Sequence, residues 1–141
     1  MRVLAAEDNR TNQLVFRKMV KDLDIDLVFA GNGLEALDLF KSFRPDLIFM
    51  DISMPEMDGR EATRQIRALE AEGKLQRTPI VALTAHAMEG DSDGILSAGL
   101  DFYLTKPLRK AAICEQILAL CPPEARRPSL AGEKEELELA V

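Results

Sequence analysis

Short apolar runs alternate with amphipathic stretches along most of the chain, and this alternation predicts five strands separated by helices. Two of the apolar runs, residues 47–50 and 80–83, are continuous rather than alternating, which is typical of strands buried on both faces. The five predicted strands are residues 2–6, 26–30, 46–50, 79–84 and 101–105.

Apolar residues three and four positions apart predict a helix after each strand. Gly73 and Gly99 are expected to end the third and fourth helices, and Pro122-Pro123 to end the fifth. The fourth helix, at about residues 89–98, has the weakest pattern. Each of the other four predicted helices has apolar residues that share one face. They are Val15, Met19 and Leu23 in the first helix, Leu34, Leu37 and Phe40 in the second, Ala62, Ile66 and Leu69 in the third, and Ile113, Ile117 and Leu120 in the fifth.

Strands that alternate with helices imply an α/β fold, with a parallel sheet covered by helices on both faces. Right-handed crossovers make the usual five-strand solution a doubly wound, flavodoxin-like (βα)5 sheet of strand order 2-1-3-4-5. This domain is expected over residues 1–121. Residues 122–141 are rich in Pro and then in Glu, and are interpreted as a linker or tail.

The composition, with 47% hydrophobic and 30% charged residues among 141, is that of one globular domain. A net charge of −6 argues against nucleic acid as a partner, because phosphate binding needs a basic face. The chain has no run of about 18 apolar residues, so we expect no membrane contact by this domain. Cys114 and Cys121 lie two turns apart on one predicted helix, roughly 10 Å, too far for a disulfide. Reduced thiols in the cytoplasm are therefore expected.

Acidic residues follow two strands that should be neighbours in the sheet. In doubly wound sheets, ligands bind at the carboxyl ends of the strands, where the strand order reverses. Glu7-Asp8 follows the first strand and Asp51 ends the third, so three carboxylates should converge. An acid at one strand end is often only solvated, but three converging acids repel one another unless a cation is present. Oxygen ligands without His or Cys suit Mg²⁺.

The other strand ends supply groups that could bind an anion. Thr84 ends the fourth strand and offers a hydroxyl, and Lys106 follows the fifth strand and offers a positive charge. Asp51 emerges from the most apolar strand and can act as a nucleophile towards phosphorus. The turn behind it ends at Asp58, a suitable cap for the next helix. This set of groups indicates phosphoryl transfer.

Five motifs, spread over about residues 2–121, resemble those of the receiver domains of two-component response regulators. The motifs are Glu7-Asp8-Asn9, the segment 50–59, Leu83-Thr84-Ala85, Ala98-Gly99-Leu100-Asp101, and Tyr103-Leu104-Thr105-Lys106-Pro107. Asn12-Gln13 and Thr84-Ala85-His86-Ala87-Met88 further resemble receivers of hybrid sensor histidine kinases. The finer resemblance implies that this chain is the receiver module of a hybrid histidine kinase. The isolated module would not be an enzyme, although it would catalyse its own phosphorylation and dephosphorylation. A stand-alone single-domain regulator is the alternative.

The resemblance implies that Asp51 is the phosphoacceptor, taking a phosphoryl group from a phosphohistidine on a histidine kinase or histidine phosphotransfer domain. It also implies that Asp8, Asp51 and the backbone carbonyl of Ser53 hold Mg²⁺, with Glu7 acting through a metal-bound water. Lys106 would pair with the phosphoryl oxygens, and a cis peptide is expected between Lys106 and Pro107.

The same resemblance implies a conformational switch. Thr84 would bond the phosphorylated side chain and Tyr103 would change rotamer with it, altering the surface of the fourth helix, fifth strand and fifth helix. That surface could also form a homodimer. Ser53 and His86 would border the pocket mouth and tune water access and the lifetime of the phosphorylated state.

Three rival functions fit the sequence less well. An aspartyl-phosphate phosphohydrolase of the haloacid dehalogenase class needs a second acid two residues after its nucleophile, where this chain has Ser53. A flavin-binding module needs a phosphate-cradling loop after the first strand, where this chain has Glu7-Asp8. A receiver that has lost phosphorylation is not supported, because every expected site residue is of a competent type.

Overall fold

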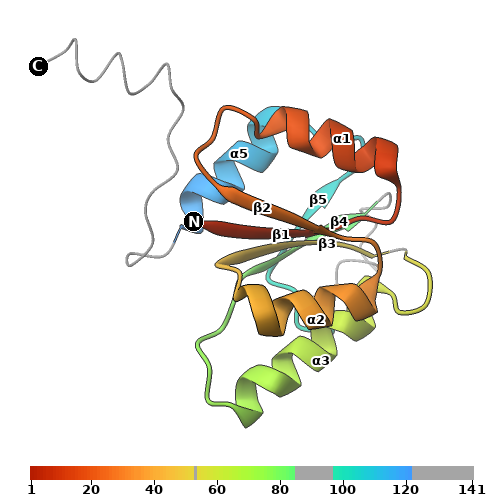
Figure 1. Ribbon diagram of the computed structural model, residues 1–141, viewed down its shortest axis with the longest axis vertical. Helices are drawn as coiled ribbons and strands as arrows, with labels where there is room; N and C mark the ends of the chain where they lie inside the picture. The colour runs from red at the N-terminus through yellow and green to blue at the C-terminus, as the bar shows by residue number, and fades with distance from the viewer. Residues whose placement is uncertain (53, 85–96, 122–141) are drawn as a thin grey trace, which may run out of the picture.

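The structure, a computed structural model, describes residues 1–52, 54–84 and 97–121. Its centre is a five-stranded parallel sheet of order β2-β1-β3-β4-β5, which confirms the predicted topology (Figure 1). Three strands begin one residue later than predicted, and β3 takes in Asp51. The strands are β1 (Arg2–Ala6), β2 (Asp26–Ala30), β3 (Leu47–Asp51), β4 (Ile80–Thr84) and β5 (Phe102–Thr105).

Helices cover both faces of this sheet. Helices α1 and α5 lie on one face and α2 and α3 on the other, as Figure 1 shows. The predicted fourth helix falls mostly outside the described residues. The helices are α1 (Arg10–Met19), α2 (Gly33–Phe43), α3 (Gly59–Glu72) and α5 (Lys110–Ala119), and none of those described is long and apolar enough to cross a membrane.

Polar side chains fix where three helices begin. Asn9, Asn32 and Asp58 accept hydrogen bonds from backbone N–H groups in the first turns of α1, α2 and α3, at 3.1, 2.9 and 2.9 Å. Such caps satisfy donors that a helix start leaves without partners. Gly73 ends α3 as predicted, and its N–H donates to the carbonyl of Leu69 at 3.0 Å. These caps fix the first residues of the three helices that follow β1, β2 and β3.

Two apolar clusters, one on each face of the sheet, form the core. Strand β3 is buried along its whole length, as its continuous apolar run predicts. On the α1–α5 face, the ring of Phe16 packs edge-on against Phe49 at 5.1 Å and Phe29 at 6.1 Å between centroids. Cys114 and Cys121 form no disulfide among the described residues.

Two predicted buried positions are wrong. Val15 is 44% exposed and Leu34 is 47% exposed, whereas Phe16 and Ala36 are buried in their place. On α1 and the turn after it, Phe16 and Val20 are buried, while Leu23 is buried and Met19 is partly buried as predicted. The sequence permits either Val15 or Phe16 on the buried face because both are apolar, and contact with the sheet selects the larger aromatic ring.

Candidate functional site

Three carboxylates meet at the carboxyl edge of the sheet. Glu7, Asp8 and Asp51 each offer an oxygen, and these oxygens lie within 4.8 Å of one another. Strands β1 and β3 pair in parallel, with Ala6 opposite Met50, so the residues that follow are neighbours. The structure thus brings together the acids that the sequence predicted at the point where the strand order reverses.

Burial makes this cluster costly without positive charge. Glu7 is 5% exposed and Asp51 is 3% exposed, while Asp8 lies on the open side. The Lys106 ammonium lies 3.0 Å from Asp51 Oδ2 and 3.5 Å from Glu7 Oε1. Burial alone lowers the pKa of Lys106, but the hydrogen bond to Asp51 and the two negative charges raise its pKa above the ordinary value. Lys106 is therefore a fixed cation at neutral pH.

The donor set fits a hard divalent cation. The three carboxylates outnumber the one ammonium group beside them, and all of them offer oxygen ligands of the kind Mg²⁺ prefers. Desolvation at this edge, followed by the hydrogen bond with the neighbouring Glu7 and its negative charge, raises the pKa of Asp8 above its ordinary value. A bound cation at this edge would remove that penalty.

The turn after β1 holds Glu7 in place. The Glu7 N–H donates to the carbonyl of Ala30 at 2.8 Å, and Gln13 Nε2 donates to the carbonyl of Glu7 at 2.7 Å. Glu7 Oε2 also accepts the N–H of Asn9 at 3.3 Å. Gln13 is a positioning residue that the sequence showed only as part of a motif.

Gly59 allows the chain to return close behind Asp51. A Cβ added at Gly59 would lie 2.9 Å from Met50 Cγ and closer still to the Asp51 carbonyl oxygen, nearer than real Cβ atoms come. The Gly59 N–H donates to the carbonyl of Ile52 at 3.1 Å, which closes the turn. The sequence predicted a turn at Gly59. The structure shows that glycine is needed there because the backbone passes so close to Met50 and Asp51 that a side chain would not fit.

Thr84 ends β4, and Lys106 follows the neighbouring strand β5. Thr84 pairs with Thr105 in the β4–β5 ladder, and the Lys106 N–H donates to the Thr84 carbonyl at 2.8 Å. Thr84 is buried, 8% exposed, beside the acids' edge of the sheet. The Lys106–Pro107 peptide bond is cis, the isomer that the resemblance implied.

The structure leaves three predicted site roles as predictions. Tyr103 lies within β5 and is 40% exposed, so its place as a switch residue stays a prediction. Ser53 and His86 lie outside the described residues, and their predicted roles at the metal and the pocket mouth stay predictions as well.

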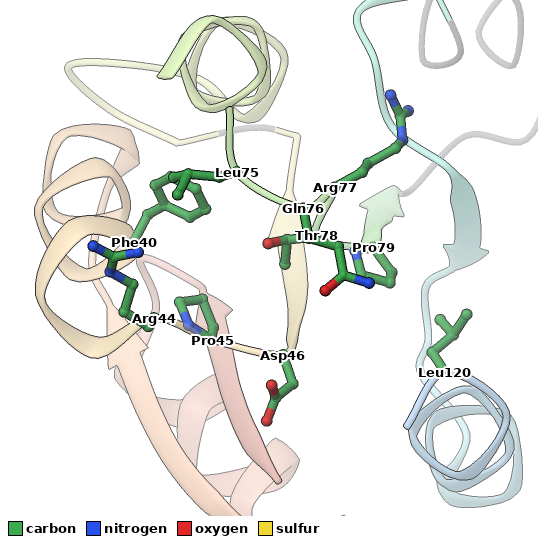
Figure 2. A pocket seen from close by; sticks show the side chains of 10 residues that line it. All are labelled: Phe40, Arg44, Pro45, Asp46, Leu75, Gln76, Arg77, Thr78, Pro79 and Leu120. Atoms are coloured by element: carbon green, nitrogen blue, oxygen red, sulfur yellow. The ribbon is translucent and has the colours of Figure 1, made fainter. Parts of the chain in front are cut away.

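A cavity of about 320 Å³ lies at the opposite edge of the sheet (Figure 2). Asp46, Pro79 and Leu120 are among its lining residues, and they mark the amino ends of β3 and β4 and the end of α5. Since no predicted site residue lines this cavity, it is separate from the acidic cluster.

Comparisons with known proteins agree with the resemblance. A family model described as the response regulator receiver domain matches residues 3–118. The chain is 39% identical over 140 residues to Sensor protein GacS of Pseudomonas syringae pv. syringae, covering 99% of this chain but only 15% of GacS. It is also 39% identical over 115 residues to the polar-differentiation response regulator DivK of Brucella anthropi, covering 82% of this chain and 91% of DivK.

Two solved structures are informative. The receiver domain of sensor histidine kinase PA1611 from Pseudomonas aeruginosa PAO1, with a magnesium ion coordinated in its active site cleft, matches with a TM-score of 0.72 and 39% identity, covering 82% of this chain and 92% of that one. The co-crystal structure of the Saccharomyces cerevisiae histidine phosphotransfer protein Ypd1 with the receiver domain of Ssk1 matches with a TM-score of 0.76 and 35% identity, covering 83% of this chain and 86% of that one.

Proposed function

This chain belongs to the response regulator receiver domain family of two-component signalling, and from that premise we propose that Asp51 accepts a phosphoryl group in a Mg²⁺-dependent phosphorelay. The observation that carries the proposal is the position of Asp51, buried among Glu7 and Asp8 with the Lys106 ammonium 3.0 Å away. An ion pair that only stabilised the fold would need one carboxylate beside the Lys106 ammonium, whereas this cluster holds three carboxylates.

In the proposed reaction, a carboxylate oxygen of Asp51 attacks the phosphorus of a phosphohistidine. The new O–P bond forms as the P–N bond breaks, and the imidazole leaves with the bonding electron pair. Lys106 remains charged and offsets the negative charge of the phosphoryl oxygens. Mg²⁺, held by Asp8 and Asp51 together with the proposed carbonyl ligand at Ser53, and by Glu7 through a metal-bound water, would supply further charge stabilisation.

We place the phosphodonor on the surface beside α1. Leu14 and Val15 are 60% and 44% exposed there, and α1 begins only three residues after Glu7. Adjacent exposed apolar side chains near a reactive site favour contact with a partner protein. A histidine phosphotransfer domain, or the corresponding part of a histidine kinase, is the proposed partner.

Phosphorylation is proposed to switch the surface that includes β5 and α5. Thr84 is proposed to bond the phosphorylated side chain, and its position at the end of β4, between the strands of Asp51 and Lys106, supports this role. Phe102 and Tyr103 are 43% and 40% exposed on β5, so this surface can be read by a partner or a second copy of the chain. Ser53 and His86 are proposed to tune the lifetime of the phosphorylated state.

We further propose that residues 1–121 form a cytoplasmic receiver module of a hybrid histidine kinase, with residues 122–141 as its linker or tail. The match to the hybrid-type sequence at Asn12-Gln13 supports this, and a stand-alone regulator such as DivK is the alternative. An immunoblot of native cells separates them, because a free-standing protein migrates near 15.7 kDa and a hybrid kinase far above it.

Intact-mass measurement tests phosphorylation directly. After incubation with acetyl phosphate and Mg²⁺, the chain should gain the mass of one phosphoryl group, and EDTA should prevent the gain. Asp51→Asn should abolish it. No gain, or a gain that survives in Asp51→Asn, contradicts the proposal, and sustained turnover of a phosphate ester substrate would favour the phosphohydrolase alternative instead.

A further inference from the structure

We infer that Gly33, at the start of α2, is a positioning residue for the acidic site. Its backbone N–H donates to the carbonyl oxygen of Met57 at 3.0 Å. Met57 lies in the turn between β3 and α3, so this bond ties α2 to the segment that carries the chain away from Asp51. The inference rests on the function proposed above and adds to it a residue that no motif singled out.

The cap of α2 leaves this N–H group available. The first N–H groups of a helix have no partner within the helix. Asn32 Oδ1 accepts the Glu35 N–H at 2.9 Å, and Glu35 Oε2 accepts the Gly31 N–H at 2.6 Å. Gly33, the first residue of α2, therefore donates outside the helix without weakening it. The positive end of the helix dipole also favours a carbonyl oxygen at this point.

The contact leaves no room for a side chain at Gly33. An added Cβ would lie 2.8 Å from both Cβ and Cγ of Met57, and closer still to the Met57 carbonyl oxygen. Gly33 does not have a positive φ, so the close approach rather than an unusual conformation requires glycine. A backbone carbonyl cannot rotate aside as the end of a side chain can, so the turn itself would have to move.

Movement of this turn would reach Asp51. The Ile52 N–H donates to the Leu83 carbonyl and the Gly59 N–H to the Ile52 carbonyl, both at 3.1 Å, and these bonds fix the two ends of the turn. The bond from Gly33 holds its middle. Glu56 beside it has a φ of 65°, which few non-glycine residues adopt, so neighbouring contacts must maintain the turn.

The experiment measures how phosphorylation of Asp51 by acetyl phosphate depends on Mg²⁺ concentration. In Gly33→Ala, the concentration for half-maximal rate should rise by about 10- to 100-fold, as for other groups that orient metal ligands, while the rate at saturating Mg²⁺ falls less. A general loss of stability would lower the rate at saturating Mg²⁺ as well, and would not raise the half-maximal Mg²⁺ concentration selectively. Gly31→Ala is the matched control, because its Cβ would meet only the movable end of Glu35, at 3.3 Å, and it should leave the Mg²⁺ dependence unchanged.

An unchanged Mg²⁺ dependence in folded Gly33→Ala would overturn the inference, as would an equal loss in Gly31→Ala. A second measurement needs no variant. In the natural chain, the NMR amide signal of Gly33 should shift during a Mg²⁺ titration with the same dissociation constant as the signal of Asp51, and a Gly33 signal that stays still would also overturn the inference. A natural chain that gains no phosphoryl group contradicts the proposed function itself, and the inference falls with it.

Discussion

Lys106 Nζ lies 3.0 Å from Asp51 Oδ2, although Asp51 ends β3 and Lys106 follows β5, two strands that are not neighbours. Strand β4 lies between β3 and β5, so the lysine side chain reaches across the carboxyl end of β4, where Thr84 stands. A phosphoryl group on Asp51 would have to enter between the carboxylate and the ammonium.

Removing the lysine should separate metal binding from switching. In Lys106→Ala, Mg²⁺ affinity measured by calorimetry should be nearly unchanged, because the carboxylates that would hold the metal remain. Phosphorylation should no longer alter hydrogen exchange along β5, since the phosphoryl oxygens lose their protein partner. Lys110→Ala is a control, because Lys110 pairs with the exposed Asp22 at 3.6 Å and not with the acidic cluster. Equal loss of metal binding and switching in Lys106→Ala would contradict its assigned role.

Neutralising Asp8 should stabilise the metal-free protein at neutral pH. The pKa of Asp8 is raised above 3.8 in the folded chain, by partial burial and then by Glu7, so ionisation of Asp8 costs folding free energy. That cost is absent below pH 3.8 and complete above the folded-state pKa. Asp8→Asn should therefore raise the free energy of unfolding at pH 7, and the difference should vanish in acid.

Urea titrations over a pH series, with and without Mg²⁺, check this prediction. Mg²⁺ should stabilise the natural chain at pH 7, less so as Asp8 is protonated, and should stabilise Asp8→Asn little at any pH. A variant that is less stable than the natural chain at pH 7 without Mg²⁺ would contradict the interpretation of Asp8 as an uncompensated charge.

The acids of the site could be predicted because topology alone brings them together. Once the strand order is inferred, the residues after β1 and β3 must be neighbours, whatever their side chains do. Thr84 and Lys106 follow from the same rule. The helix phase on α1 could not be predicted in this way, because the series through Val15 and the series through Phe16 are both apolar.

Contacts between distant loops also left no signal in the sequence. Glycine has no side chain to form a pattern, so the approach of Gly33 to Met57 appears only once both elements are placed. The same holds for Arg67 on α3, whose partner Asp101 is 34 residues away, just before β5. Arg67 also pairs with Glu70, three residues further along α3.

The ionic cluster around Arg67 should contribute much more stability than a surface ion pair. Arg67 is 14% exposed and donates to Glu70 at 2.8 Å, to Asp101 at 2.7 Å and to the carbonyls of Gly99 and Thr78. Arg67→Met would leave two largely buried carboxylates without this partner. We expect it to lower the free energy of unfolding by about 3 kcal/mol in urea titrations.

Arg64→Met is the matched control for this change. Arg64 lies on the same helix and pairs with Glu61 at 3.2 Å, but the two side chains are 56% and 48% exposed. Its removal should change the free energy of unfolding by only about 0.5 kcal/mol. Similar losses in the two variants would show that burial does not set the contribution of these pairs.

Docking on α1 should be separable from the chemistry at Asp51. Replacing Leu14 and Val15 by Ser removes apolar surface that is already exposed, so the fold should be retained. Transfer from a phosphorylated histidine phosphotransfer domain should slow by about 10-fold or more, because losing interface contacts worth about 1.4 kcal/mol weakens binding tenfold. Phosphorylation by acetyl phosphate should stay unchanged, because a small donor needs no docking surface.

Leu75→Ser is the control that tests whether the loss of any exposed leucine slows the transfer, since Leu75 is 39% exposed and lines the cavity at the opposite edge of the sheet. Equal slowing with both donors would place Leu14 and Val15 in the chemistry rather than in partner binding.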